Sequence, residues 1–123
     1  MFEISVTMDF SAAHNLRGYR GKCEEFHGHN WKVQVSLASG SLGKIGMVED
    51  FKVIKQRLKD ILALVDHKYL NSLPYFKKDN PTSENIAKFI YERMKAKSKR
   101  GRLKILSVKV WETEQCAAMY YEE

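Results

Sequence analysis

Three of the four histidines in this chain have the spacing of metal ligands. His27 and His29 are separated only by Gly28, and His14 lies upstream of them. Because successive side chains of a strand point to opposite faces, residues two apart point to the same face. A third imidazole on a neighbouring strand, about 4.8 Å away, would complete a three-histidine site. Three neutral nitrogens without a fourth protein ligand are typical of catalytic zinc, which keeps one position open for substrate or water.

Cys23 lies four residues before His27, and its position leaves three interpretations open. A buried thiol is commonly a small hydrophobic side chain. As a fourth ligand, Cys23 would close the zinc site, although a bound thiolate would then fill the position that catalysis needs. As a base beside the metal, it would have its pKa lowered by the cation.

Asp66, His67 and Glu112 are candidates for catalysis or for substrate binding. Asp66 and His67 are expected to end the first helix, where a histidine can simply favour the negative helix end. Alternatively, Asp66 orients the His67 imidazole for proton transfer. Glu112 closes an apolar strand, where it is either solvated or accepts two hydrogen bonds from the N–H and NH₂ edge of a pterin or guanine ring.

The elements that must position these residues follow from hydrophobic periodicity. Apolar residues alternate over residues 2–10 and 31–37, and residues 103–111 and 116–121 also have the character of strands. Helical spacing runs from about residue 51 to 65, with Asp50 as its N-cap. A second helix begins near residues 80–85, where Thr82 or Ser83 can cap it. This order predicts an α+β fold, a four-stranded antiparallel sheet with two helices packed on one face.

Bulk composition narrows the class of protein. A chain of 123 residues is expected to form one domain, residues 1–123. No apolar run approaches the roughly 20 residues of a membrane span, the first residues alternate like a strand, and two cysteines make a disulfide framework improbable. We therefore expect a soluble, cytoplasmic protein without a membrane partner.

Much of the net charge of +6 comes from residues 95–102. This basic run has three interpretations: a solvated helix end, a contact with nucleic acid, or a region that attracts anionic substrates. The absence of interleaved aromatic residues there argues against a surface for stacking single strands.

Taken together, the motifs resemble the 6-pyruvoyltetrahydropterin synthase superfamily, and the resemblance covers nearly the whole chain. The spacing of three residues between the cysteine and His-Gly-His is similar to that of the bacterial 6-carboxytetrahydropterin synthases. The motifs are, in order, Ala13-His14, then Cys23 and after three residues His27-Gly28-His29-Asn30, Gly46-Met47-Val48-Glu49-Asp50-Phe51, Asp66-His67-Lys68-Tyr69-Leu70-Asn71, Asn80-Pro81-Thr82-Ser83-Glu84-Asn85 and Trp111-Glu112-Thr113.

The resemblance implies a tunnelling fold, in which three subunits join their sheets into a barrel and two such trimers form a hexamer. It also implies a role for each motif residue. The implied zinc ligands are the three histidines His14, His27 and His29. The implied catalytic residues are Cys23 and, from a different subunit, the pair Asp66 and His67. The implied pterin-binding residues are Glu112, Thr82 and Ser83.

The implied reaction is that of a zinc-dependent lyase in queuosine biosynthesis. It converts 7,8-dihydroneopterin triphosphate to 6-carboxy-5,6,7,8-tetrahydropterin, acetaldehyde and triphosphate. The triphosphate requires cations, for which Arg17, Arg20 and Lys22 are candidates. The alternatives are a pyruvoyltetrahydropterin synthase or a dihydroneopterin aldolase-like enzyme of the same fold. A zinc-stabilised nucleic-acid-binding module is a further alternative, but structural zinc sites generally use closed, cysteine-rich sets of four ligands.

Overall fold

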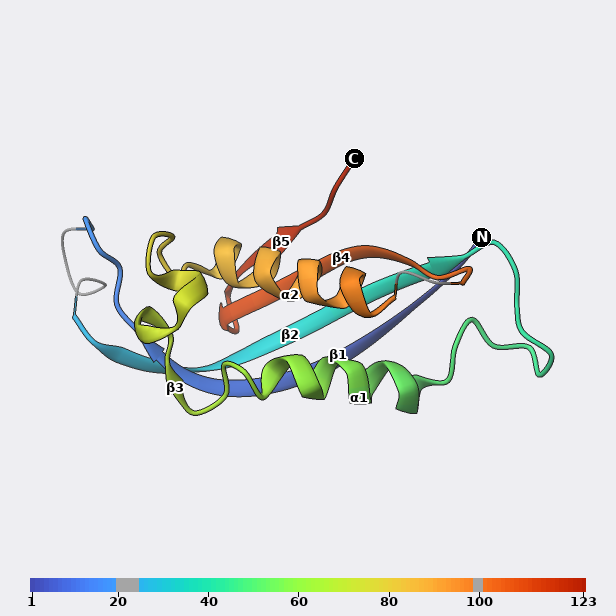
Figure 1. Ribbon diagram of the computed structural model, residues 1–123, viewed down its shortest axis with the longest axis horizontal. Helices are drawn as coiled ribbons and strands as arrows, with labels where there is room; N and C mark the ends of the chain where they lie inside the picture. Colours follow the sequence, from blue (N-terminus) through green and yellow to red (C-terminus); the bar gives the residue numbers. More distant parts are fainter. Residues whose placement is uncertain (20–24, 99–100) are drawn as a thin grey trace.

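A five-stranded sheet forms one layer of the molecule, as seen in the computed structural model, which describes residues 1–19, 25–98 and 101–123 (Figure 1). Its strand order is β3-β1-β2-β4-β5. All neighbouring pairs are antiparallel except β1 and β3, which are parallel. The strands are β1 (Phe2–His14), β2 (His27–Ser39), β3 (Lys68–Tyr69), β4 (Lys104–Thr113) and β5 (Cys116–Tyr120).

Two helices, α1 (Phe51–Leu62) and α2 (Ser83–Lys97), cover one face of the sheet (Figure 1). Alternate residues of β2, from Trp31 to Leu37, are fully buried in the core beneath them. Both predicted caps are present: the Asp50 side chain accepts from Lys52 N at 2.8 Å, and the Thr82 hydroxyl accepts from Asn85 N at 3.1 Å. The predicted α+β class with two helices on one face is confirmed.

The fifth strand and the end of α1 differ from the prediction. β3 contains only two residues, too few to produce an alternating pattern. α1 ends at Leu62 rather than Val65, and residues 63–67 form turns that lead into β3. His67 adopts a left-handed φ of 57°, and its backbone N–H donates to Ser11 O of β1. The pairing of this segment with the sheet therefore ends the helical path before Asp66, so the prediction that Asp66 and His67 end the helix was wrong.

The basic run at the end of α2 is partly engaged within the chain. Lys95 Nζ lies 2.9 Å from a carboxylate oxygen of Glu122, and Arg102 donates to Val48 O at 3.0 Å. Lys99 and Arg100 lie outside the described residues. These contacts favour the interpretation of the run as a solvated helix end. In the part of the chain that the structure describes, no helix is long and apolar enough to cross a membrane.

Candidate metal centre

The three predicted histidines meet at one end of the sheet, on the face that carries the helices. His14 ends β1 and His27 begins β2, and the two residues are direct partners in the antiparallel register. His29 points to the same face as His27 because it lies two residues further along β2. The ring centroids are 4.5 Å apart for His14 and His27, 4.7 Å for His27 and His29, and 5.4 Å for His14 and His29. The strand pairing therefore brings the three rings together.

Trp31 forms the inner wall of this cluster. Its side chain is fully buried, and its ring packs edge to face against His14 at 4.9 Å and His29 at 5.3 Å between centroids. The indole Nε1–H donates to Ala12 O at 3.2 Å, which fixes the ring against β1. Periodicity identified Trp31 only as a core residue of β2, because its contact with the histidines depends on the pairing of two strands.

Backbone carbonyls orient two of the three imidazoles. His14 Nδ1 lies 2.7 Å from Pro81 O, and His27 Nδ1 lies 2.7 Å from Glu25 O. A carbonyl oxygen can only accept a hydrogen bond, so each Nδ1 carries the proton and each Nε2 keeps a free lone pair. Outer contacts of this kind hold metal-binding histidines in the correct orientation. Both Nε2 atoms point into the cluster.

Glu112 reaches the same point from β4. Val108, Val110 and Glu112 alternate on the helix-covered face of that strand, and the Glu112 side chain is 30% exposed. Its Oε1 lies 3.3, 3.8 and 2.9 Å from the Nε2 atoms of His14, His27 and His29. The ligand atoms of all four residues lie within 4.8 Å of one another. Glu112 was predicted to bind the pterin and not the metal, whereas the structure places its carboxylate against the three histidines.

Burial prepares the histidines to bind a cation. The Nε2 atoms of His14 and His29 are buried and have no hydrogen-bond partner among the described residues. Removal from water lowers the pKa of both His14 and His29, because burial penalises the charged imidazolium. Both rings are therefore neutral near pH 7, the form that coordinates metals. Unpartnered imidazole nitrogens beside a carboxylate fit a zinc ion or a similar divalent metal.

The Asp66–His67 pair is a separate feature at the β3 edge of the sheet. Asp66 Oδ1 lies 3.0 Å from His67 Nδ1 and accepts a 2.9 Å hydrogen bond from Ser11 N. The bond from Ser11 is the main reason that the pKa of Asp66 is lowered, which keeps it a carboxylate able to orient the imidazole. His67 is 81% exposed, and its left-handed backbone is of a kind that clusters at functional sites.

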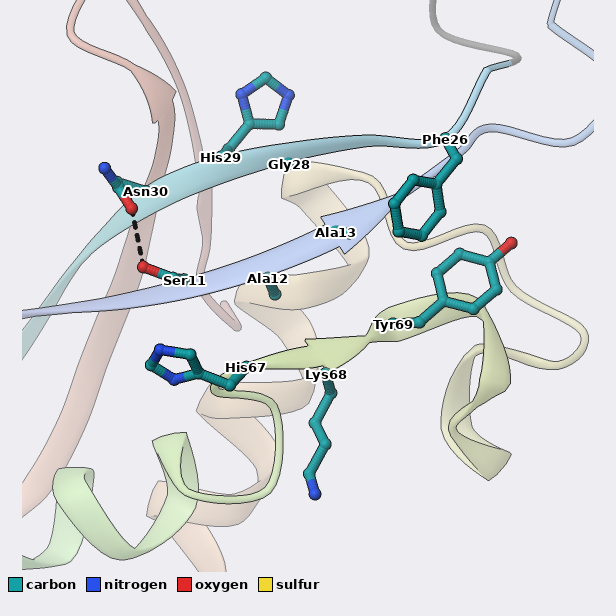
Figure 2. A pocket seen from close by; sticks show the side chains of 10 residues that line it. All are labelled: Ser11, Ala12, Ala13, Phe26, Gly28, His29, Asn30, His67, Lys68 and Tyr69. Carbon is teal, nitrogen blue, oxygen red and sulfur yellow. Dashed lines mark hydrogen bonds between the residues drawn. The ribbon is translucent and has the colours of Figure 1, made fainter.

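Among the described residues, no hydrogen bond or ion pair joins this pair to the histidine cluster. Figure 2 shows β1 and β2 lying between the rings of His29 and His67. His67 of the pair and His29 of the cluster both line a hollow of about 500 Å³ at the β1–β3 edge, whose walls also include Gly28, Phe26 and Tyr69. The rings of Phe26 and Tyr69 pack with centroids 5.1 Å apart. The chain therefore presents two sets of chemically active residues that border one hollow without contacting each other in the described part of the chain.

The other predicted residues have varied outcomes. Cys23, Arg20 and Lys22 lie outside the described residues. Arg17 donates from its guanidinium to Phe76 O at 2.6 Å, so at least part of this cation supports the fold. The Thr82 hydroxyl is occupied as the N-cap of α2, and Ser83 is the first residue of that helix. Their motif also supplies the Pro81 carbonyl that orients His14.

Two asparagines that sequence reasoning did not single out hold the segment after His14. Asn71 accepts from Asn15 N at 2.9 Å and donates to Asn15 O at 2.8 Å. Asn80 makes the same paired contacts with Arg17, at 3.0 and 2.8 Å. The only sequence signal for Asn71 and Asn80 was their position in the Asp-His and Asn-Pro motifs. Their hydrogen-bond partners lie more than fifty residues away in sequence. Such contacts follow from tertiary structure alone.

Comparison with known proteins gives consistent matches. The profile of a family described as 6-pyruvoyl tetrahydropterin synthase matches residues 3–123. A 6-carboxy-5,6,7,8-tetrahydropterin synthase from Haemophilus influenzae is 36% identical over 145 aligned residues, covering 99% of this chain and all of that protein. A putative enzyme of the same name from Archaeoglobus fulgidus is 38% identical, covering 90% of this chain and 88% of its own length. The structure of 6-pyruvoyl tetrahydropterin synthase from Caenorhabditis elegans has a TM-score of 0.87 at 28% identity and covers 99% of this chain and 96% of its own.

Proposed function

Because this chain belongs to the 6-pyruvoyl tetrahydropterin synthase family, we propose that it is a zinc-dependent lyase acting on 7,8-dihydroneopterin triphosphate. The products are 6-carboxy-5,6,7,8-tetrahydropterin, acetaldehyde and triphosphate, and the reaction belongs to queuosine biosynthesis. The observation that carries this proposal is the convergence of His14, His27 and His29 on one point beside the ring of the buried Trp31. The names of the relatives from Haemophilus influenzae and Archaeoglobus fulgidus support the carboxy product.

The three histidines hold the metal through their Nε2 atoms, as their Nδ1 contacts to backbone carbonyls favour for His14 and His27. When bound, zinc supplies Lewis-acid chemistry that acidifies the C–H groups next to the side-chain oxygens of the substrate. The hydrophobic wall formed by Trp31 limits access of water to the ligands. The metal half of the site is therefore built within one chain.

Cys23 and the Asp66–His67 pair move protons on the substrate side chain. The contact between His67 Nδ1 and Asp66 leaves His67 Nε2 available to the substrate. Because no hydrogen bond or ion pair joins this pair to the cluster in the described part of its own chain, and β1 and β2 lie between the rings of His67 and His29, we propose that it serves the metal of a neighbouring subunit in a trimer or hexamer. The substrate then binds between the two chains.

The overall reaction consumes one water and needs no external reductant. The substrate side chain is oxidised at the carbon next to the ring, which becomes the carboxyl group. The ring gains two hydrogens across its C6–N5 bond, so the oxidation and the reduction balance within one molecule. The outer two carbons leave as acetaldehyde and the phosphate chain leaves as triphosphate. The residues therefore need to relocate protons and not to supply electrons.

The test is incubation of the zinc-loaded protein with 7,8-dihydroneopterin triphosphate, followed by mass identification of the pterin. We expect 6-carboxy-5,6,7,8-tetrahydropterin together with acetaldehyde. Formation of 6-pyruvoyltetrahydropterin alone would assign the chain to the pyruvoyl-forming enzymes. Unchanged substrate in the presence of stoichiometric zinc would overturn the proposal.

A further inference from the structure

The carboxylate of Glu112 occupies a position among the histidines that hydrogen bonding does not explain. Its Oε1 lies within 3.8 Å of all three Nε2 atoms, yet the Nε2 atoms of His14 and His29 have no hydrogen-bond partner among the described residues. A carboxylate bound to one ring by a hydrogen bond would be aligned with a single N–H. Here one oxygen is shared between three nitrogens.

The tautomers of His14 and His27 also argue against a hydrogen bond from these rings to Glu112. His14 and His27 direct their Nδ1 atoms to backbone carbonyl oxygens, so their Nε2 atoms turn lone pairs toward the Glu112 oxygen. An acceptor that faces another acceptor in a buried site is repulsive. A cation placed between them reverses the sign of the interaction, because every one of these atoms can then donate a lone pair to it.

The separations between the atoms agree with this arrangement. Zinc bonds to imidazole nitrogen and carboxylate oxygen of about 2.0–2.1 Å place tetrahedral ligands about 3.3 Å apart. The distances from Glu112 Oε1 to the three Nε2 atoms are 2.9, 3.3 and 3.8 Å and bracket that separation. The ligand atoms of the four residues lie within 4.8 Å of one another, so Glu112 is close enough to take the fourth position once an ion draws the ligands together.

The backbone of β4 explains how the carboxylate reaches this corner. The pairing of β4 with β5 is irregular between Trp111 and Thr113, so Glu112 has no partner residue on β5. An extra residue of this kind is a β-bulge, which bends the strand and changes the direction of a side chain. Bulges also recur next to active sites.

We infer that Glu112 is the fourth ligand of the metal in the substrate-free enzyme and that it leaves the metal when the pterin binds. This inference rests on the proposed function and deepens it. To accept two hydrogen bonds from the N–H and NH₂ edge of the pterin, both oxygens of the carboxylate have to face the ring, which draws Oε1 away from the three histidines. Binding of the pterin ring therefore frees the coordination position next to the substrate side chain, so that the metal is opened only when there is a substrate to act on.

The test uses the cobalt-substituted protein, because the visible absorption of Co²⁺ reports its number of ligands. We expect the substrate-free wild type to have the intense spectrum of a four-coordinate ion. Glu112→Ala and Glu112→Gln should change this spectrum and weaken zinc affinity by at least about tenfold, the effect expected when support for a ligand set is lost. Glu114→Ala is the matched control, since Glu114 lies two residues away outside the cluster and should leave both unchanged.

Unsubstituted pterin, which lacks the reacting side chain, provides the second measurement. It should shift the cobalt spectrum of the wild type toward that of Glu112→Ala and should leave the spectrum of Glu112→Ala nearly unaltered. Identical spectra for the wild type and both Glu112 variants would overturn the inference while leaving the proposed function intact. A wild-type protein that binds neither cobalt nor zinc would instead contradict the proposed function itself. Circular dichroism of each variant verifies that it is folded.

Discussion

The histidine cluster and the Asp66–His67 pair differ in how completely a single chain builds them. The cluster is assembled by three strands, walled by a buried tryptophan, and His14 is only 1% exposed. The pair lies at a sheet edge next to a two-residue strand, and His67 is 81% exposed. Burial makes the cluster ready to bind a metal, whereas the exposed His67 is oriented by Asp66 and lies at an open hollow.

The difference fits the proposal that the two regions of one active site come from different chains. Burial favours metal binding, because low solvent access strengthens the electrostatic interactions of the ligands with the ion and keeps the imidazoles neutral. A proton-transfer group has to meet a substrate that enters from outside, so it can stay exposed until a second subunit covers it. The predictions below separate the two regions, beginning with the largest effect.

Removal of a histidine from each region should have opposite consequences for the metal. We expect His29→Ala to lose most of its bound zinc, because the cluster then lacks one of its three histidine ligands. His67→Ala should keep the wild-type zinc content and still lose activity. Elemental analysis of the purified variants measures this, and full zinc occupancy in His29→Ala would contradict the ligand assignment.

Cys23→Ala should reduce turnover by about 10²- to 10⁴-fold, the range typical of a lost acid or base, and should retain zinc. Cys23 lies outside the described residues. This result would assign Cys23 the same role as His67, that of a proton-transfer group. Parallel assays of kcat and zinc content distinguish the open interpretations. Loss of metal would identify Cys23 as a ligand, and normal kcat would identify it as a packing residue.

Asn80→Ala should destabilise the fold by about 1–3 kcal/mol, because a paired contact with the backbone of Arg17 is lost. Asn30→Ala is the matched control on the exposed side of β2, where Asn30 accepts a single bond from the Ser11 hydroxyl. Its cost should stay within about 0.5 kcal/mol. Urea titration of the two variants compares them, and equal effects would mean that Asn80 does not support the loop that carries His14.

The smallest expected effect is the pH dependence of the metal-free protein. Burial lowers the pKa of His14 and His29 below the ordinary value of 6.5, so the unfolded chain takes up protons first as the pH falls. Because the unfolded state then binds more protons, stability falls as the pH drops through about 6.5 and levels off below the folded-state pKa values. Thermal unfolding between pH 7.5 and 5.5 measures the change in Tm. A Tm that rises on acidification would contradict the assigned burial.

The parts of the fold and site that follow from short-range patterns could be predicted. Alternation located β1, β2 and β4, and the His-x-His spacing on a strand was enough to expect His27 and His29 on one face. The position of Glu112 was not predictable, because it depends on a bulge and on the order of three strands. β3 was too short to leave a pattern. The turn that places His67 depends on a backbone contact with Ser11, which no local sequence signal reveals.

The central claim is that one active site joins the metal cluster of one chain to the Asp66–His67 pair of another. Co-expression of His27→Ala with His67→Ala in equal amounts tests it directly, because each variant alone lacks one half of every site. In randomly assembled mixed oligomers, half of the metal clusters and half of the Asp66–His67 pairs are intact. Roughly a quarter of the sites then combine an intact cluster with an intact pair, so about a quarter of the wild-type activity should return. If mixed oligomers form but remain as inactive as the single variants, both halves act within one chain and the account is wrong.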